Sequence, residues 1–312
     1  MKILLIRNDN IGDLICTTPA IEAIAKKYGK ESVDIVVNSY NYPAIRSNPF
    51  VNEIFSYTKP KHKRGLGAKI SAAFSKLNVL FKIFVNKYDA AVILRSSYSP
   101  WAALFAKTSG ARQIIGVRPA GKKSCISDPI DIPALTHEVM LCFLCLAPLG
   151  VSYNGENTLY TPLKPNNTYK DYVFFHICAR MKENKISKEK ILQILELLKA
   201  RFERVVITAE DSTIGEEISS LSGVKYQKTK SLDELANYLC AAKLALTLEG
   251  GMMHLAPALK VPTIALFGRS EIAHWKPWGH NCTALQDESR LAQNISLELI
   301  ANALDKAKNE LN

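Results

Sequence analysis

The sequence has no apolar run long enough to cross a bilayer. A membrane-spanning helix needs about 18–20 consecutive apolar residues, and the best candidate, residues 139–151, is shorter and contains Pro148. The first apolar run, residues 3–6, is too short for the hydrophobic part of a signal peptide and is typical of a buried strand. We therefore expect a cytoplasmic protein whose contact with a membrane, if it has one, is peripheral.

The sequence also lacks the cysteine patterns of a disulfide framework or a structural zinc site. Its seven cysteines are an odd number in mostly apolar surroundings, as in proteins of a reducing compartment. Cys142 and Cys145 form a CxxC pair, but neither a second CxxC nor a pair of histidines completes a zinc site. We predict free cysteines, with this pair buried on a helix.

Two glycine-rich signatures of nucleotide chemistry are missing as well. The sequence contains neither the GxGxxG turn of dinucleotide-binding folds nor the GxxxxGK[ST] loop of P-loop proteins, so redox-cofactor and ATPase functions lose support. It has no recognition motif for nucleic acid.

Acidic residues are scarce in the first half of the chain. The whole sequence has 40 Lys plus Arg against 29 Asp plus Glu, a net charge of +11. Residues 1–165 hold 21 basic and 11 acidic residues, whereas residues 166–312 hold 19 and 18. A net charge of +10 on one half and +1 on the other indicates that the first half meets an anionic partner.

What the sequence does have is an alternation of short apolar runs and longer helical patterns, which is typical of parallel sheets covered by helices. The runs are residues 3–6, 33–37, 90–94, 173–178, 205–208, 244–248 and 263–267. The length is about twice that of a typical domain. We predict an α/β protein with Rossmann-like domains at 1–160 and 161–312, a linker near 161–170, and a final amphipathic helix at 296–311 that docks on either domain.

Two turns in this pattern carry chemistry. Gly12 allows a tight turn after the first strand, and Asp13 follows either as a helix N-cap or as a general base for a substrate hydroxyl; Thr18-Pro19 is a second possible helix start. Near the C-terminus, Gly250-Gly251 lies between a strand and a helix, where backbone N–H groups suit a diphosphate.

Together these stretches resemble the lipopolysaccharide heptosyltransferases, glycosyltransferase family 9. The matching motifs are Ile11-Gly12-Asp13, Thr17-Thr18-Pro19-Ala20, Ser231-Leu232-Asp233-Glu234-Leu235-Ala236, residues 251–259 with 262–268, and Trp275-Lys276-Pro277-Trp278-Gly279. Because they occur in order through both halves, the resemblance implies a GT-B fold, with two Rossmann-like domains whose parallel sheets face a central cleft. The nucleotide-sugar donor would bind the C-terminal domain and the acceptor mainly the N-terminal domain.

The resemblance implies an inverting glycosyltransferase that moves a heptose from ADP-heptose to a sugar hydroxyl of the lipopolysaccharide inner core, of the Kdo–lipid A type. The resemblance also implies that the reaction needs no cofactor or metal. In agreement, the sequence has no Asp-x-Asp motif. Asp13 matches the catalytic base. Donor binding falls to Arg180, Lys185, Glu210, Glu249, Gly250, Gly251, Met252 and His254, and we assign acceptor binding to Arg7, Gly12, Thr17, Thr18, Lys61, Lys63 and Arg64.

Several residues keep a second reading. The family usually has Asp-Ser/Thr-Gly at Glu249-Gly250-Gly251, so Glu249 is either a donor ligand or a structural cap. Lys185 is preferred over Lys182 for the diphosphate, although Ile186-Ser187 replaces the family's Trp-Pro after it. His254 is either a packing histidine or a donor contact. Another nucleotide sugar or acceptor, such as a protein or capsule glycan, or a catalytically silent sugar-nucleotide-binding protein, remains the alternative function.

A cationic run at residues 59–69 precedes a helical pattern with one apolar face. That face consists of Ile70, Phe74, Leu77, Leu80, Phe81, Phe84 and Val85, with Lys69, Lys76, Lys82 and Lys87 elsewhere. A basic amphipathic helix of this kind suits the anionic inner face of the cytoplasmic membrane. A core-facing helix with a basic outer surface is the equal alternative.

Overall fold

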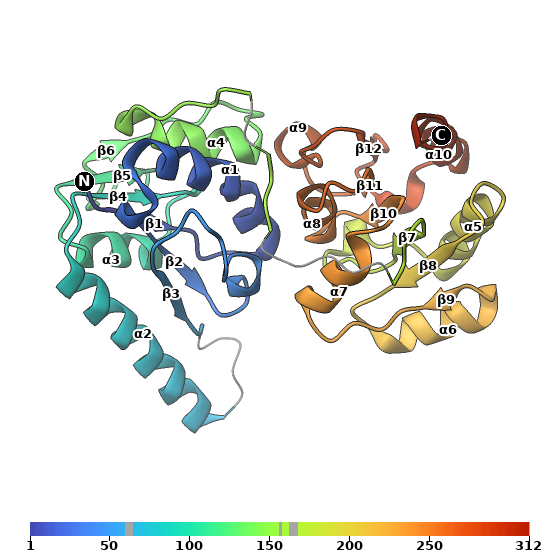
Figure 1. Cartoon of the computed structure of the whole chain (residues 1–312), viewed down its shortest axis with the longest axis horizontal. Coiled ribbons are helices and arrows are strands. Elements are labelled where there is room, and N and C mark those ends of the chain that lie inside the picture. Colours follow the sequence, from blue (N-terminus) through green and yellow to red (C-terminus); the bar gives the residue numbers. More distant parts are fainter. Residues whose placement is uncertain (60–64, 156–157, 162–167, 312) are drawn as a thin grey trace. The chain divides into compact units, whose positions relative to one another are not determined.

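Each half of the chain builds one six-stranded, fully parallel sheet (Figure 1). The computed structural model describes residues 1–59, 65–155, 158–161 and 168–311. The chain divides into two units, Met1–Thr158 and Leu159–Asn312, each with its own core. The sequence placed the boundary after residue 160 and the linker near 161–170, of which residues 162–167 lie outside the described part.

The two sheets have the same strand order. In the N-terminal unit it is β3-β2-β1-β4-β5-β6, and in the C-terminal unit β9-β8-β7-β10-β11-β12. The strands are β1 (Ile3–Ile6), β2 (Val33–Asn38), β3 (Ile54–Tyr57), β4 (Ala90–Ile93), β5 (Gln113–Gly116), β6 (Asp128–Pro129), β7 (Val173–His176), β8 (Val205–Thr208), β9 (Lys225–Tyr226), β10 (Leu244–Leu248), β11 (Thr263–Phe267) and β12 (Cys282–Gln286). This is the doubly wound Rossmann order, in which ligands bind where the order reverses, at the carboxyl ends of the two central strands. That switch point lies between β1 and β4 in one unit and between β7 and β10 in the other.

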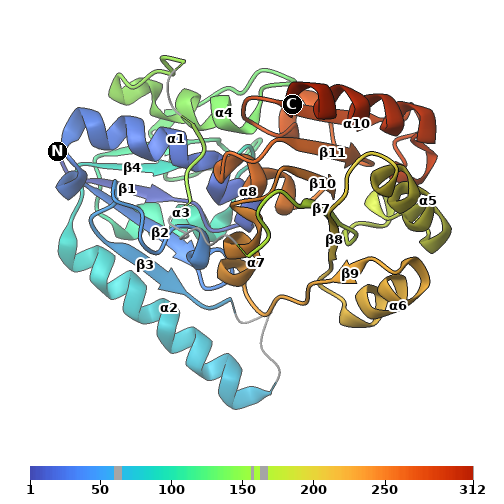
Figure 2. The ribbon, with the colours of Figure 1, turned by 45° about the vertical axis from the view of Figure 1, so that its right-hand side comes forward.

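Helices cover both faces of each sheet (Figure 2). In the N-terminal unit they are α1 (Ile11–Tyr28), α2 (Leu66–Asn86), α3 (Pro100–Thr108) and α4 (Glu138–Leu146); in the C-terminal unit they are α5 (Lys188–Lys199), α6 (Ser212–Ser222), α7 (Leu232–Leu239), α8 (Met252–Ala258), α9 (Ile272–Trp275) and α10 (Leu297–Leu311). α2 and α3 pack on one side of the first sheet, and α1 packs against α4. The final helix, α10, places Ile300 and Leu304 in the core of the C-terminal unit together with α5, which decides where this helix docks.

The helix after β1 begins earlier than either sequence reading. α1 starts at Ile11 with Asn10 as its N-cap residue, so Asp13 lies in the first turn. The prediction of Asp13 as the N-cap residue is therefore wrong, and so is the alternative start at Thr18-Pro19. Pro19 lies inside the helix and cannot donate to the carbonyl of Ile15. The Thr18 hydroxyl donates to that carbonyl at 2.6 Å, so the acceptor that proline leaves open is satisfied locally.

Two bulk predictions are confirmed. All seven cysteines are free, and Cys142 and Cys145 are buried on α4. None of the helices in the described ranges is both long enough and apolar enough to traverse a bilayer.

Candidate functional site

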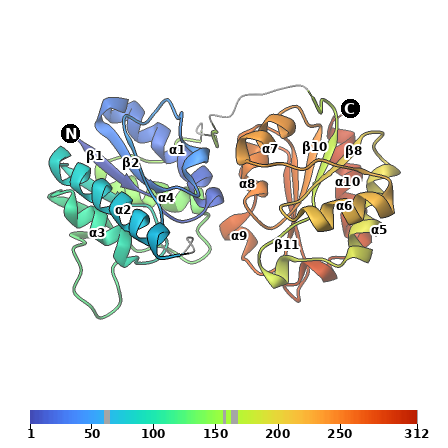
Figure 3. The ribbon, with the colours of Figure 1, turned by 90° about the horizontal axis from the view of Figure 1, so that it is seen from below.

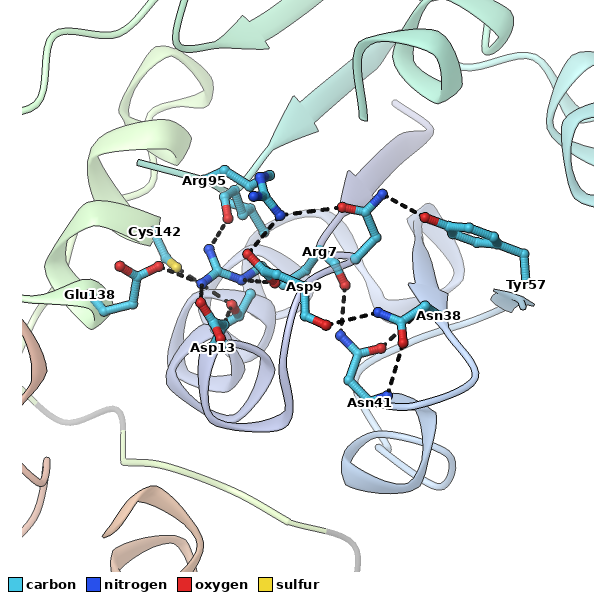
Figure 4. Close-up of polar contacts among 12 residues, drawn as sticks. Arg7, Asp9, Asp13, Asn38, Asn41, Tyr57, Arg95, Glu138 and Cys142 are labelled. Atoms are coloured by element: carbon cyan, nitrogen blue, oxygen red, sulfur yellow. Dashed lines mark hydrogen bonds and ion pairs between the residues drawn. The ribbon is translucent and has the colours of Figure 1, made fainter. Parts of the chain in front are cut away.

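A cluster of buried charges occupies the switch point of the N-terminal unit (Figure 4). Arg7 is the first residue after β1 and is 1% exposed. Its guanidinium donates to the carbonyl of Leu94, just after β4, and to the carboxylates of Asp13 and Glu138. Arg7 Nε lies 3.0 Å from Asp9 Oδ1. One side chain therefore ties together the ends of both central strands and the first turns of α1 and α4.

Asp13 is, like Asp9 at 14%, a partly accessible carboxylate of this cluster. Its Oδ1 lies 3.1 Å from Arg7 Nη2, and its side chain is 15% exposed, against 1% for Glu138. Glu138 is the first residue of α4, where the His137 side chain caps the helix by accepting from the Val139 N–H at 3.1 Å. The predicted base thus has its carboxylate oriented by Arg7 Nη2, which also donates to the buried carboxylate of Glu138.

Burial and mutual attraction set the ionisation of the cluster. Burial raises the pKa of Asp9 to about 6, against the opposing effects of Arg7 and Arg95. Burial alone would lower the pKa of Arg7, but the carboxylates of Asp9, Glu138 and Asp13 outweigh it and raise that pKa above its usual value. Arg7 is therefore a permanent cation in this site.

An outer ring of polar side chains holds the loop between β1 and α1. Arg95, after β4, donates to Asp9 Oδ2 at 2.9 Å. Asn41 donates to the carbonyl of Arg7, and Asn38 donates to the carbonyl of Asp9. Asn8 donates to the hydroxyl of Tyr57. Figure 4 shows these groups surrounding the loop, which explains why an irregular segment can hold charged groups in fixed positions.

The structure shows where most of the acceptor candidates lie. Arg7, Gly12, Thr17 and Thr18 are all buried. Thr17 and Thr18 use their hydroxyls on helix carbonyls at 2.8 and 2.6 Å, and Arg7 uses its guanidinium on the cluster. These contacts position the loop and its helix, and acceptor binding by these residues stays a prediction. Lys61, Lys63 and Arg64, the other acceptor candidates, lie outside the described residues.

In the C-terminal unit, the loop after β7 carries the predicted diphosphate ligands. Arg180, Lys182 and Lys185 are exposed. The turn Lys182–Asn184 between them is held by Asn184, which is 2% exposed and accepts from the Arg269 N–H at 2.8 Å. A Cβ on Gly268 would lie 2.1 Å from the Glu183 carbonyl oxygen. Gly268 is thus required for the loops after β7 and β11 to approach, and their contact presents the basic residues to solvent.

The loop after β10 contains the Gly-Gly turn. Gly250 and Gly251 are exposed, and Met252 and His254 are buried in α8. The His254 ring packs edge-on to Trp275 with centroids 6.0 Å apart. Glu249 accepts from the N–H groups of Gly268 and Ser270 and from the Ser270 hydroxyl. Both carboxylate oxygens of Glu249 are used on the loop after β11, which favours its structural reading.

The remaining donor candidate and one residue that the sequence reasoning missed lie at the ends of β7 and β8. Glu210 is exposed two residues after β8. His176, the last residue of β7, is buried with its Nδ1 3.0 Å from the Thr208 hydroxyl. Burial lowers the pKa of His176 to about 4. In the sequence, His176 could have been recognised as a histidine within the apolar run at residues 173–178.

All donor-side candidates therefore lie at the carboxyl ends of strands of the second sheet. They follow β8, β7 and β10, which are neighbours in the order β8-β7-β10. Figure 3 shows β8, β10 and β11 of this unit with helices on both sides of them. Across the described ranges, no three His, Cys, Asp or Glu side chains are grouped so as to hold a metal ion. The carboxyl ends of these strands thus carry exposed cationic side chains, an exposed Gly-Gly turn and an exposed carboxylate.

Asp9, Arg95 and Glu138 are further site residues that the sequence reasoning missed. Asp9 and Arg95 follow central strands, a position that marks them only once the strand order is known. Glu138 precedes an apolar helix and has the appearance of an ordinary helix-start carboxylate in the sequence.

Comparison with known proteins agrees with this arrangement. Residues 165–298 match the model of glycosyltransferase family 9 (heptosyltransferase). Lipopolysaccharide heptosyltransferase 3 of Escherichia coli is 26% identical over 295 residues, covering 86% of this chain and 84% of that protein. The structure of E. coli heptosyltransferase WaaC with ADP has a TM-score of 0.79, with 16% identity and 100% coverage of both chains. A family 9 glycosyltransferase from Veillonella parvula has a TM-score of 0.81, with 18% identity and coverage of 99% and 97%.

The structural likenesses confirm the predicted GT-B fold. The family model and the sequence likeness confirm the resemblance that the motifs indicated. The chain is therefore similar to the heptosyltransferases of glycosyltransferase family 9, in the sequence of its C-terminal half and in its fold.

Proposed function

We propose that this protein transfers a heptose from ADP-heptose to a sugar hydroxyl of a lipopolysaccharide inner core, with inversion and without a metal. The observation that carries the proposal is the gathering of Arg180, Lys185, Glu210 and the Gly250-Gly251 turn at the carboxyl ends of three neighbouring strands. That is the edge where a doubly wound sheet binds a nucleotide. The likeness to lipopolysaccharide heptosyltransferase 3 supports the sugar and the acceptor class.

The donor diphosphate would be held by charge and backbone together. Lys185 supplies a mobile cation, and Gly250-Gly251 supplies N–H groups with no side chain in the way; a Cβ at Gly251 would meet no atom within 4 Å. These groups would stabilise the negative charge that develops on the leaving ADP. Glu210, exposed beside them, would accept from ribose hydroxyls of the nucleotide.

Asp13 would act as the base. Its carboxylate takes the proton of the acceptor hydroxyl while the hydroxyl oxygen bonds to the anomeric carbon. The bond from that carbon to the phosphate oxygen breaks on the opposite face, and its electron pair leaves with ADP. Arg7 fixes the carboxylate through Oδ1, which leaves Oδ2 for the proton. Because the proposed acceptor is a lipid, we also propose that the enzyme is cytoplasmic and contacts the membrane peripherally.

The test is product formation. Purified protein is incubated with ADP-heptose and a Kdo–lipid A acceptor, and the heptosylated lipid is detected by mass spectrometry. We expect Asp13→Asn to abolish transfer while ADP still raises the melting temperature. Glu22→Gln, on the same helix and ion-paired with Lys26, should keep wild-type transfer. Wild-type rates in Asp13→Asn would refute the base assignment.

The donor assignment is tested separately by a thermal-shift panel of nucleoside diphosphates and their sugars. Lys185→Ala should weaken ADP-heptose binding more than Lys182→Ala. Because Glu249 is occupied by Gly268 and Ser270, the loop lacks the free acid of the family's usual motif, and another nucleotide sugar remains the alternative donor. A larger shift with a different nucleotide than with ADP would select that alternative.

A further inference from the structure

Helix α2 has two apolar faces, and only one of them meets the core. Ala72, Val79 and Ile83 are at most 4% exposed and pack in the core of the N-terminal unit. On the other side, six large apolar residues are 48–67% exposed: Ile70, Phe74, Leu77, Phe81, Phe84 and Val85. At about 100° per residue these six fall within an arc of about 100° that is centred opposite the buried three.

This exposure contradicts the core-facing alternative for the helix. Of the apolar residues that the sequence pattern placed on one face, only Leu80 packs against the core, as a partly buried neighbour. Isolated exposed apolar residues are common, but a continuous stripe of three phenylalanines with neighbouring aliphatic side chains marks a surface that binds something. This face of α2 is therefore not buried within the N-terminal unit, and a partner outside the unit would have to cover it.

The charges near the stripe indicate which kind of partner would bind it. Residues 66–86 contain no Asp or Glu. By helical position, Lys82 lies about 60° beyond one edge of the stripe and Lys76 about 80° beyond the other. Lys82 Nζ is 3.7 Å from Glu53 Oε1, just before β3. Lys76 Nζ lies 2.8 Å from the ring centroid of Trp101, which is 58% exposed at the start of α3. The stripe is thus flanked by cations, one of which contacts an exposed tryptophan.

We propose that the outer face of α2, together with Trp101, inserts into the surface of an anionic lipid bilayer with the helix axis in the membrane plane. Phenylalanine and leucine side chains enter the acyl region, the flanking lysines meet phosphate headgroups, and tryptophan sits at the interface. A second copy docked through the same face would bring lysines against lysines, with no carboxylate on the helix to pair with them. The net charge of +10 on residues 1–165 has the sign that this partner requires.

The test is flotation of the full-length protein with vesicles. Because it needs neither donor nor acceptor, its outcome does not depend on the proposed reaction. Wild type should bind vesicles of phosphatidylethanolamine and phosphatidylglycerol, and bind at least tenfold more weakly to phosphatidylcholine vesicles or in high salt. Phe74→Ser/Phe81→Ser should weaken binding to the anionic vesicles at least tenfold. Lys76→Gln/Lys82→Gln should weaken binding and flatten its salt dependence.

Leu221→Ser is the matched control, because Leu221 is a helical apolar residue that is 61% exposed on α6 of the other unit. It should bind vesicles as wild type does. Far-ultraviolet circular dichroism and thermal melting of the phenylalanine and leucine variants should match wild type, since Phe74, Phe81 and Leu221 are exposed. The same measurements on Lys76→Gln/Lys82→Gln show whether the loss of the Lys76–Trp101 contact changes the fold. Absence of wild-type binding to anionic vesicles, or equal binding by Phe74→Ser/Phe81→Ser, would overturn the proposal. A concentration-dependent dimer that this variant loses would assign the face to a second copy instead.

Discussion

At the scale of single residues, the charged cluster around Arg7 is a competition among three carboxylates for one buried guanidinium. Asp9, Asp13 and Glu138 all approach Arg7, and Arg95 draws Asp9 to the other side. Buried charges are stable only when they are paired. A change at one carboxylate is therefore felt at the others, including the proposed base.

Glu138→Gln should lower kcat at least tenfold while the KM for the donor changes less than twofold. The substitution keeps the shape of the side chain but removes its charge, so Arg7 is drawn more strongly to Asp13 and a carboxylate held this way accepts a proton less readily. Steady-state kinetics with varied donor measure the split. The control Glu22→Gln, which lies outside the Arg7 cluster, should change neither constant.

A purely structural role for Glu138 makes a different prediction. The variant would then lose about 1–3 kcal/mol of stability from an imperfectly satisfied buried group, with kcat unchanged at temperatures well below its melting point. Thermal melting measured beside the kinetics separates the two outcomes.

His176 should titrate well below the ordinary range of a histidine. Its pKa is lowered from 6.5 to about 4 by burial. Between these values the unfolded chain binds a proton that the folded chain does not, so stability is lost as pH falls from about 6.5 to 4. The full effect is about 3 kcal/mol.

NMR titration of the histidine ring protons measures this pKa directly. We expect the resonance that titrates near 4 to disappear in His176→Gln and to persist in His280→Gln, which changes an exposed histidine. Titration of every histidine near 6.5 would be incompatible with the buried, neutral ring.

At the scale of elements, hydrophobic runs predicted the central strands and missed the outer ones. The runs at 3–6, 205–208, 244–248 and 263–267 match β1, β8, β10 and β11 exactly as bounded in the structure, because strands buried on both faces are continuously apolar. β3 alternates partly buried and buried residues, and β9 has two residues. Such strands lack a continuous run, and pairing with a neighbour defines them.

Loop contact is a second property of elements, and Gly268→Ala tests it. The added Cβ would lie 2.1 Å from the Glu183 carbonyl oxygen and 2.6 Å from Asn184 Oδ1, so the turn that carries Lys182 and Lys185 must move. We expect ADP affinity to fall at least tenfold by isothermal titration calorimetry. Gly67→Ala, whose Cβ meets no atom within 4 Å, is the control and should bind ADP normally.

At the scale of the whole molecule, one topology is used twice with different surroundings. Both units follow the same strand order. The switch point of the first unit holds a buried ion cluster, whereas that of the second holds exposed cations and glycines. The difference between the two switch points therefore comes from the loops rather than from the sheets.

This difference predicts where ADP protects the chain. In hydrogen–deuterium exchange, ADP should slow exchange in the loops after β7, β8 and β10, and leave the loop at residues 7–13 unchanged. Lys185→Ala should lose the protection and Asp13→Asn should keep it. Protection confined to Met1–Thr158 would place the nucleotide on the other unit.

The sequence by itself determined the α/β class, the central strands, the free cysteines and the resemblance to family 9, because each depends on local composition, periodicity or motif order. It also placed Asp13 and the Gly-Gly turn after strands. Only the tertiary structure decided that Arg7, Thr17 and Thr18 are buried and act inside the unit. It also decided that Glu249 binds the neighbouring loop and that the phenylalanines of α2 face outward. Burial and partners depend on which elements pack together, and an amphipathic pattern shows that a helix has an apolar face without showing what that face meets.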